Sequence, residues 1–215
     1  MTIEYLTVAD DAEAEIEVKR SRFLAAACRV ESQEAAREVV EEARRRHWNA
    51  RHHCSAFVLG PDGSLARSSD DGEPAGTAGA PILRSVRAHE VSDVVVVVTR
   101  WFGGVLLGAG GLARAYGEAA TAALDASGRL RRELMLEVGI HSPIADAPRL
   151  ENLVRSQGFS VQGTEYGPDG REAELRVAIP TPRLPELQSF VDTHSHGRAI
   201  VHPGGERWVD SSSLR

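Results

Sequence analysis

The spacing of hydrophobic and polar positions changes several times along the chain, and each regular stretch predicts one element. Apolar residues at helical spacing predict helices, whereas alternating or short continuous apolar stretches predict strands. Residues 94–99 are almost entirely β-branched and lack alternation, which is typical of a strand covered on both faces. Residues 33–47 follow Ser32, a good N-cap, and carry alanines and valines at helical spacing, so they predict a helix.

The same criteria predict the remaining elements of the first 132 residues. Residues 1–14 are polar, and we expect them to be loosely held. The strands are expected at 15–18 and 22–30, with a hairpin of 54–59 and 64–68 around a glycine-containing turn. The other helices are expected at 78–88 and 112–126.

A new series of elements starts at Glu133. Strands are expected at 134–140, 159–166, 172–179 and 199–209, and helices at 143–157 and 181–193. This order is β-α-β-β-α-β, the order of a ferredoxin-like split fold. The sequence therefore predicts two α+β domains, 1–132 and 133–215, with the boundary near residues 131–133.

Composition narrows the class of protein. The chain has 215 residues, of which 42% are hydrophobic and 26% charged, as in an ordinary soluble protein. Its formal net charge of −6 argues against a general coat for nucleic acid, although a local basic patch remains compatible with it. Two cysteines are too few for a disulfide framework. With a polar N-terminus and no long apolar run, we expect a cytoplasmic protein without a membrane contact.

Two glycine-rich loops, each followed by a predicted helix, carry the densest chemistry. The first is Asp70-Asp71-Gly72-Glu73-Pro74-Ala75-Gly76-Thr77-Ala78-Gly79. The second is Arg100-Trp101-Phe102-Gly103-Gly104, continued by Leu107-Gly108-Ala109-Gly110-Gly111-Leu112-Ala113-Arg114-Ala115-Tyr116. Glycines allow positive φ and a close approach of backbone N–H groups, and a helix N-terminus behind them attracts anions.

Together with Arg20-Ser21-Arg22-Phe23 and His52-His53-Cys54, these two motifs resemble the YigZ/IMPACT family. The resemblance covers roughly residues 15–130, and residues 134–209 are similar in pattern to the C-terminal domain of bacterial members. It implies a two-layer N-terminal domain like the second domain of ribosomal protein S5, followed by a ferredoxin-like C-terminal domain. Eukaryotic relatives act in translational control through a protein partner, so the resemblance implies a link to translation, and by analogy of fold to RNA or the ribosome.

The glycine loops leave two interpretations open. In the first, their amides bind a phosphate, and in the second the glycines only permit tight strand-to-helix turns. The loops lack a Gly-Lys-Ser/Thr motif, so we do not expect ATP to be used. The candidates for anion or RNA binding are Arg100, Gly103, Gly104, Gly108, Gly110, Gly111, Arg114, Gly76, Thr77 and Gly79.

The acids of the first loop also allow two roles. Asp70, Asp71 and Glu73 could bind Mg²⁺ or act as general acid and base. We favour a structural role, in which they pair with Arg100 and Arg114, cap nearby amides and hold the two loops together.

Two further segments combine reactive or basic side chains. His52, His53 and Cys54 could bind a metal or form a thiol–histidine pair, but packing in a strand explains them as well, and we predict no metal site. The basic run contains Arg44, Arg45, Arg46, Trp48 and Arg51, and it fits either RNA contacts or cations at a helix C-terminus. We expect Phe102 to pack in the core, and the role of Trp101 remains open.

The sequence therefore favours a non-enzymatic protein without a cofactor that binds RNA, the ribosome or a translation-associated protein partner. The alternative is an enzyme that acts on a phosphate-bearing small molecule and uses an acid of the first loop. The oligomeric state cannot be inferred from these patterns.

Overall fold

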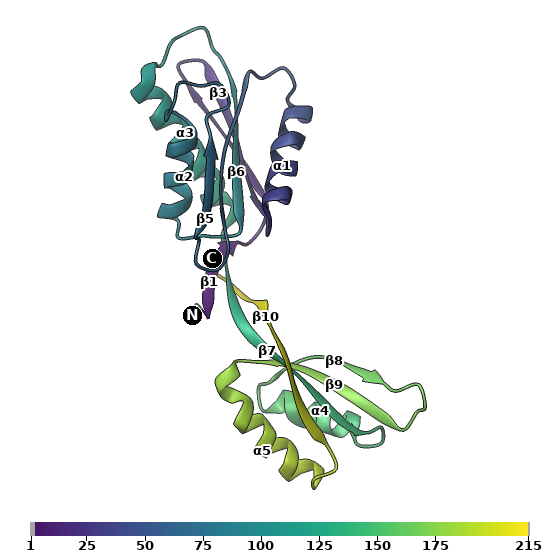
Figure 1. The fold of residues 1–215 in the computed structure, drawn as a ribbon. Helices are drawn as coiled ribbons and strands as arrows, with labels where there is room; N and C mark the ends of the chain where they lie inside the picture. Colours follow the sequence, from purple (N-terminus) through teal and green to yellow (C-terminus); the bar gives the residue numbers. More distant parts are fainter. Residues whose placement is uncertain (1–2, 215) are drawn as a thin grey trace. The chain divides into compact units, whose positions relative to one another are not determined.

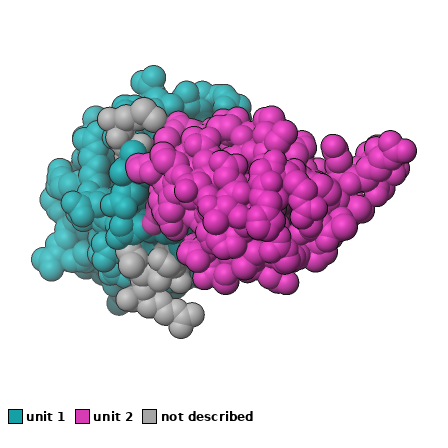
Figure 2. Space-filling model, turned by 90° about the horizontal axis from the view of Figure 1, so that it is seen from below, with its two compact units in different colours: residues 1–132, 210–215 teal, residues 133–209 magenta. Residues whose placement is uncertain are grey.

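The computed structural model describes residues 3–214 and divides into two compact units. The first contains the described residues up to Arg132 together with those from Asp210 onward, and the second is Glu133–Val209 (Figure 2). The sequence placed everything after residue 132 in the second domain. The difference arises because the last strand continues past Val209 into the first unit.

The first unit is built on one antiparallel sheet in the order β2-β3-β6-β4-β5. Its strands are β2 (Ala12–Val18), β3 (Ser21–Arg29), β6 (Val94–Trp101), β4 (His52–Leu59) and β5 (Leu65–Ser69). Helix α1 (Gln33–Arg46) covers one face, and α2 (Gly79–Ala88) and α3 (Gly108–Ser127) cover the other (Figure 1). Helix α1 therefore adds a third layer to the two that the resemblance implied.

The central strand β6 explains why its sequence does not alternate. Val94, Val96 and Val98 join the cluster under α2 and α3, whereas Val95 and Val97 pack with α1. All five are buried, because both faces of the strand are covered by helices. The prediction for this strand is confirmed.

Some element boundaries differ from the expectation. The segment expected to be loosely held contains β1 (Glu4–Val8) and the start of β2, which pairs with β3 from Ala12 onward. Helix α3 begins at Gly108 rather than at residue 112, so the glycines that were assigned to the loop form its first turn. The predicted cap of α1 is confirmed, since Ser32 Oγ accepts from the Ala35 amide at 3.0 Å.

The second unit has the ferredoxin-like topology that the element order predicted. Its sheet has the order β10-β7-β9-β8, and β1 of the first unit also pairs with β7. The elements are β7 (Arg129–Pro143), α4 (Ala147–Ser156), β8 (Ser160–Tyr166), β9 (Glu172–Ile179), a 3-10 turn at Thr181–Arg183, α5 (Leu184–Ser195) and β10 (Ile200–Leu214). Side chains such as Leu150 of α4 and Leu187 of α5 pack against Ile140 and Val177 of the sheet.

Strands β7 and β10 are longer than the sequence predicted, and their outer ends belong to the first unit. Arg132 near the start of β7 forms ion pairs with Glu31 (2.7 Å), Asp93 (3.5 Å) and Asp210 (3.1 Å). Asp210 of β10 also accepts two hydrogen bonds from Arg29. These charged groups link both strand ends to the body of the first unit. None of the helices in residues 3–214 has the length and apolar character needed to cross a bilayer.

Candidate functional site

The two glycine loops lie at the same end of the first unit, where β6 ends and β4 begins. Between them is a cavity of about 350 Å³, which we call the glycine-loop pocket. Its lining consists of Arg51, His52, Glu73, Pro74, Arg100, Phe102, Leu106, Leu107, Gly108, Ala109 and Leu112. The sequence motifs thus meet in space although they are about thirty residues apart in the chain.

A buried ion pair lies beside this pocket. Arg100 Nη1 donates a hydrogen bond to Glu73 Oε1 at 2.5 Å, and the Tyr116 hydroxyl donates to the same oxygen at 2.7 Å. The side chains of Arg100 and Glu73 are only 8% and 4% exposed. The Arg100 guanidinium also lies 5.5 Å from the Phe23 ring centre and 5.7 Å from that of Phe102. This pair joins the first loop to β6, as the structural role predicted for Glu73 requires.

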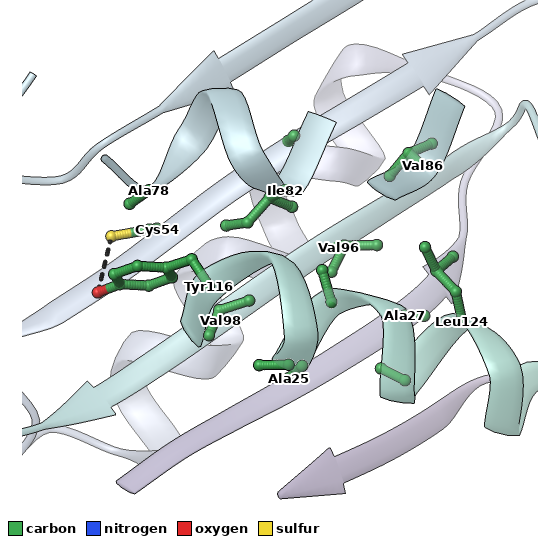
Figure 3. Close-up of a cluster of buried hydrophobic side chains, with 14 of the residues drawn as sticks. Ala25, Ala27, Cys54, Ala78, Ile82, Val86, Val96, Val98, Tyr116 and Leu124 are labelled. Atoms are coloured by element: carbon green, nitrogen blue, oxygen red, sulfur yellow. Dashed lines mark hydrogen bonds between the residues drawn. The ribbon is translucent and has the colours of Figure 1, made fainter. Parts of the chain in front are cut away.

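Tyr116 of α3 completes the floor of this region. It is fully buried and packs edge-on against Phe23, with 5.2 Å between the ring centres. Figure 3 shows its hydroxyl facing Cys54 of β4, 3.4 Å from the sulfur. Burial, together with Cys54 and Glu73, raises the pKa of Tyr116 well above its ordinary value, so the hydroxyl stays a neutral donor. The sequence placed Tyr116 in a motif but gave it no role.

The first loop is closed by its own carboxylate. Asp70 Oδ1 accepts from the amides of Ala78 and Gly79 at 3.0 and 2.8 Å, and its Oδ2 accepts from the Gly76 amide at 2.8 Å. Burial acts to raise the pKa of Asp70, but these three N–H groups together lower it below the ordinary value. The anion at the N-terminus of α2 is therefore a side chain of the protein itself.

This arrangement corrects the anion-binding role assigned to the first loop. The amides of Gly76 and Gly79 are used by Asp70, and the amide and hydroxyl of Thr77 both donate to Pro74 O. At Gly79 a Cβ would lie 2.8 Å from the Ser69 nitrogen, so this glycine is required for close packing. Gly76, Thr77 and Gly79 are architectural residues.

Asp71 ties the same loop to its surroundings. Its Oδ1 accepts from Arg44 at 2.6 Å, and its Oδ2 accepts from the His53 amide at 2.7 Å. His52 Nδ1 lies 2.8 Å from Asp71 O, which leaves His52 Nε2 4.0 Å from Glu73 Oε1. Asp70, Asp71 and Glu73 are all engaged within the protein, and all three shape the loop.

The histidines and cysteines do not form the site that their spacing suggested. Within residues 3–214, no three His, Cys, Asp or Glu side chains are grouped closely enough to hold a metal ion. Burial raises the pKa of Cys54 to about 12 and that of Cys28 to about 11, so both thiols are poor nucleophiles at neutral pH. Cys54 is fully buried, and His53 is also buried, with its pKa lowered by desolvation.

The second loop is open, in contrast to the first. Within residues 3–214 no side chain caps the N-terminus of α3, and its first-turn residues Gly108, Ala109 and Gly110 are exposed. A Cβ at Gly110 would meet no atom within 4 Å, so packing does not require a glycine there. The loop before the helix also exposes apolar side chains: Phe102 is 51% exposed, Val105 40% and Leu106 83%. The expectation that Phe102 packs in the core is wrong.

The other candidate glycines of this loop have different reasons to be glycine. Gly104 and Gly108 have φ of 83° and 72°, where a side chain is strained. A Cβ at Gly103 would lie 2.0 Å from the Arg20 backbone, and its amide donates to Ser21 Oγ at 3.2 Å. Gly103 is therefore architectural. Gly111 faces the Leu107 side chain: a Cβ added at Gly111 would lie 3.2 Å from the Leu107 Cβ.

The two arginines predicted to pair with the first-loop acids have different partners in the structure. Arg100 meets Glu73 as expected, but Arg114 lies on the exposed side of α3, where its Nε donates to Glu118 Oε1 at 2.8 Å. Arg114 is absent from the lining of the glycine-loop pocket and pairs with none of the first-loop acids. The prediction for Arg114 is wrong because residues four apart on one helix face each other, and Glu118 is the nearer partner.

Most of the basic run is neutralised locally. Arg44 pairs with Asp71 and Glu41, Arg45 with Glu42, and Arg46 with Glu13. Trp48 is 83% exposed, and Arg51 is exposed with no hydrogen bond or ion pair to the described residues. Of this run, only Arg51 lines the glycine-loop pocket, so its guanidinium is the positive charge that the run can offer to a ligand there.

Trp101 lies at the end of β6 beside this run. Its Nε1 donates to Asn49 Oδ1 at 3.1 Å, and the Arg22 guanidinium lies 3.8 Å from its ring centre. Leu106 and Leu107 were not among the predicted site residues. Their apolar side chains in a loop between glycines were the available signal. Leu106 is exposed, whereas Leu107 is half-buried and packs against the core of the first unit.

Comparison with known proteins gives consistent matches. Residues 19–124 match the family model of the Impact N-terminal domain. The chain is 38% identical over 212 residues to the IMPACT family member YvyE of Bacillus subtilis, covering 99% of this chain and 96% of that protein. It is 36% identical over 183 residues to the IMPACT family member YigZ of Escherichia coli, covering 84% and 88%. A crystal structure described as that of a hypothetical protein has a TM-score of 0.65 and 32% identity, covering 94% of this chain and 97% of that chain.

Proposed function

Since the chain belongs to the IMPACT family, we propose that it acts by binding, without catalysis, and that its ligand is RNA, alone or within the ribosome. The binding surface is the end of the first unit that carries the glycine-loop pocket. The link to translation comes from the family resemblance, and the surface comes from the geometry.

One observation carries this proposal: the uncapped N-terminus of α3 opens beside exposed apolar side chains. The first-turn amides attract an anion, and Phe102 and Leu106 offer an apolar surface on which a base can stack or pack. Arg51 adds a positive charge that pairs with no acid in the part of the chain that the structure describes. These are the elements of single-strand recognition, which combines phosphate contacts with stacking.

The net charge of −6 limits how much of the surface takes part. Arg44, Arg45 and Arg46 are paired with acids, so a broad electrostatic surface is not available there. The proposal therefore concerns a small contact with few phosphates rather than a long groove.

Salt-dependent binding of a labelled single-stranded RNA tests the proposal. Each phosphate contact to a single strand contributes about 0.7 to the slope of log K against log salt. Arg51→Ala should weaken binding and lower this slope by about that amount. Arg114→Ala is the matched control, because Arg114 is also an exposed arginine but lies outside the pocket. Absence of salt-sensitive binding in the wild type, or equal effects of the two variants, contradicts the proposal.

A protein partner is the main competing ligand for the same surface. Exposed Phe102, Val105 and Leu106 would suit a protein–protein contact as well. Co-purification of a partner that survives nuclease treatment and is lost in Leu106→Ser, with no RNA binding by the purified chain, would replace RNA by that partner.

A second candidate function is catalysis on a phosphate-bearing small molecule. Its support is that Glu73 and His52 both line a pocket of about 350 Å³, a volume in the range of small-molecule sites. Asp71, by contrast, is held by Arg44 and His53 and is a poor candidate for a base. Turnover of phosphate esters that is abolished by His52→Asn without loss of thermal stability would establish an enzyme.

A further inference from the structure

We infer that the glycine-loop pocket binds one nucleoside 5′-monophosphate unit, either free or as the phosphorylated 5′ end of an RNA strand. The second source rests on the proposed function, and the first does not. The inference names a ligand that differs chemically from an internal RNA nucleotide, because a 5′-monophosphate is a phosphomonoester.

The phosphate group matches the start of α3. This helix has 20 residues and no side-chain cap, and Gly108, Ala109 and Gly110 in its first turn are exposed. A phosphomonoester carries a charge of about −1.5 to −2 at pH 7 and three acceptor oxygens. An internal phosphodiester has one charge and two such oxygens. The uncapped helix end therefore favours the terminal phosphate.

Arg100 provides an independent indication of a ligand. Its side chain is 8% exposed and lines the pocket, yet only Nη1 donates a hydrogen bond, to Glu73. Within residues 3–214 its Nε has no hydrogen-bond partner. A guanidinium has five N–H donors, and buried donors without partners are costly. Because Arg100 lines the pocket, an acceptor on a ligand there can use the N–H groups that face the cavity, whereas Nε itself is buried away from it.

The remaining residues that line the pocket suit a nucleoside. Phe102, Leu106 and Leu112 form an apolar side of the pocket, which can contact a base. Both hydrogen bonds to Glu73 from Arg100 and Tyr116 go to Oε1, so Oε2 remains an acceptor. His52 is oriented by Asp71 O, which places its Nε2 near Glu73. These acceptors complement ribose hydroxyls or base N–H groups, whereas inorganic phosphate would not use them.

The volume of the pocket limits the ligand to one nucleotide. The pocket holds about 350 Å³, near the lower end of small-molecule sites. Beneath it, Tyr116 and the Arg100–Glu73 pair are buried and close the floor. A pocket of this size with a buried floor accepts the end of a strand more readily than a continuous strand passing through.

The test compares three RNAs of identical sequence, about ten nucleotides long, at one salt concentration. They carry a 5′-monophosphate, a 5′-hydroxyl, or a 5′-hydroxyl with a 3′-monophosphate. We expect the first to bind about tenfold more tightly than the other two by fluorescence anisotropy. The 3′-phosphorylated strand controls for charge alone. A nucleoside 5′-monophosphate should compete, while the nucleoside or inorganic phosphate at the same concentration should not.

Gly110→Ala is the decisive variant. The new Cβ has free space within the protein and points toward the N-terminus of α3, where the phosphate is expected. It should remove the preference for the 5′-phosphate without lowering the melting temperature. Arg114→Ala on the same helix should keep the preference.

The outcomes separate this inference from the proposed function. Equal affinity for all three RNAs, or a preference that persists in Gly110→Ala, overturns the inference while RNA binding stands. If no RNA binds but a nucleoside 5′-monophosphate raises the melting temperature of the wild type and not of Gly110→Ala, the inference holds for the free ligand and the proposed function fails. Absence of both signals overturns both.

Discussion

The two glycine loops of the first unit look alike in sequence and differ in structure. Each contains several glycines and leads into a helix, α2 or α3. In the first loop, Asp70 accepts three hydrogen bonds from the amides at the start of α2. In the second, no side chain of the described residues caps α3, and Phe102, Val105 and Leu106 before it are exposed.

The difference shows what a glycine-rich helix start means physically. Such a start attracts an anion in both cases, because helix N-termini carry partial positive charge. In the first loop the protein supplies the anion as a carboxylate, so the loop is structural. In the second the position is left to the solvent or a ligand. A glycine motif at a helix start is thus a candidate anion site only where no nearby carboxylate already accepts hydrogen bonds from its amides.

The largest expected effect comes from the acid that links the two loops. Glu73→Ala leaves the guanidinium of Arg100 buried without its partner, and breaking one side of a buried ion pair costs about 3–5 kcal/mol. We expect the free energy of unfolding, measured in urea, to fall by this amount. The double variant Glu73→Ala/Arg100→Met should be more stable than Glu73→Ala alone. A loss below about 1 kcal/mol would mean that the two loops are not coupled through this pair.

Removing Asp70 should make the first loop resemble the second. Asp70→Ala leaves the amides of Gly76, Ala78 and Gly79 without their acceptor, and the loss of a helix cap costs about 0.5–2 kcal/mol. Added sulfate should restore stability to this variant more than it stabilises the wild type, since it can replace the carboxylate. Equal effects of sulfate on both proteins would show that the emptied loop does not bind anions.

A pair of glycine substitutions sharpens the contrast. Gly79→Ala forces a Cβ to within 2.8 Å of the Ser69 backbone, so we expect a loss of about 1–3 kcal/mol. Gly110→Ala adds a methyl group in open space within a helix and should raise stability by about 0.5–1 kcal/mol. Thermal and urea unfolding show whether the free energy of unfolding falls in Gly79→Ala and rises in Gly110→Ala. If Gly110→Ala destabilised the protein, its glycine would be structural and the second loop would be less open than described.

The smallest expected effect is a pH dependence specific to the first loop. The pKa of Asp70 is lower in the folded protein than in the unfolded chain, so its contribution to stability is present above the unfolded value of about 3.9. It is lost as the pH falls through the lower folded value. The difference in unfolding free energy between wild type and Asp70→Asn should therefore shrink between pH 5 and about pH 2. A difference that stays constant over this range would exclude a charged cap.

The fold could be predicted largely from local patterns. The unbroken run at Val94–Val98 indicated a strand with both faces covered, and helices lie on both faces of β6. The order of elements after Glu133 indicated the ferredoxin-like topology that the second unit has. The start of α3 was misplaced, because glycines are poor helix formers and their helical turn depends on the context.

The site was predicted only in part. The motifs identified both loops and a pairing of the first-loop acids with Arg100, without saying which acid, but they also gave Arg114 a partner in the first loop and placed Phe102 in the core. Arginine side chains are long, and several acids lie within reach in sequence, so charge alone does not select the pair. Phe102 lies just beyond the end of β6, where side chains no longer point alternately to the two faces of the sheet, so its direction could not be predicted.

The sequence by itself determined most of the elements, the two-unit organisation and the position of both glycine loops, because propensity, periodicity and capping act between residues close in the chain. Tertiary structure alone decided which of the first-loop acids caps the first helix start, that Arg100 and Tyr116 share the Glu73 carboxylate, and that the start of α3 stays open. These pairings join residues 6 to 43 positions apart. They depend on how the sheet brings β4, β6 and the helices together, and no local pattern encodes that geometry.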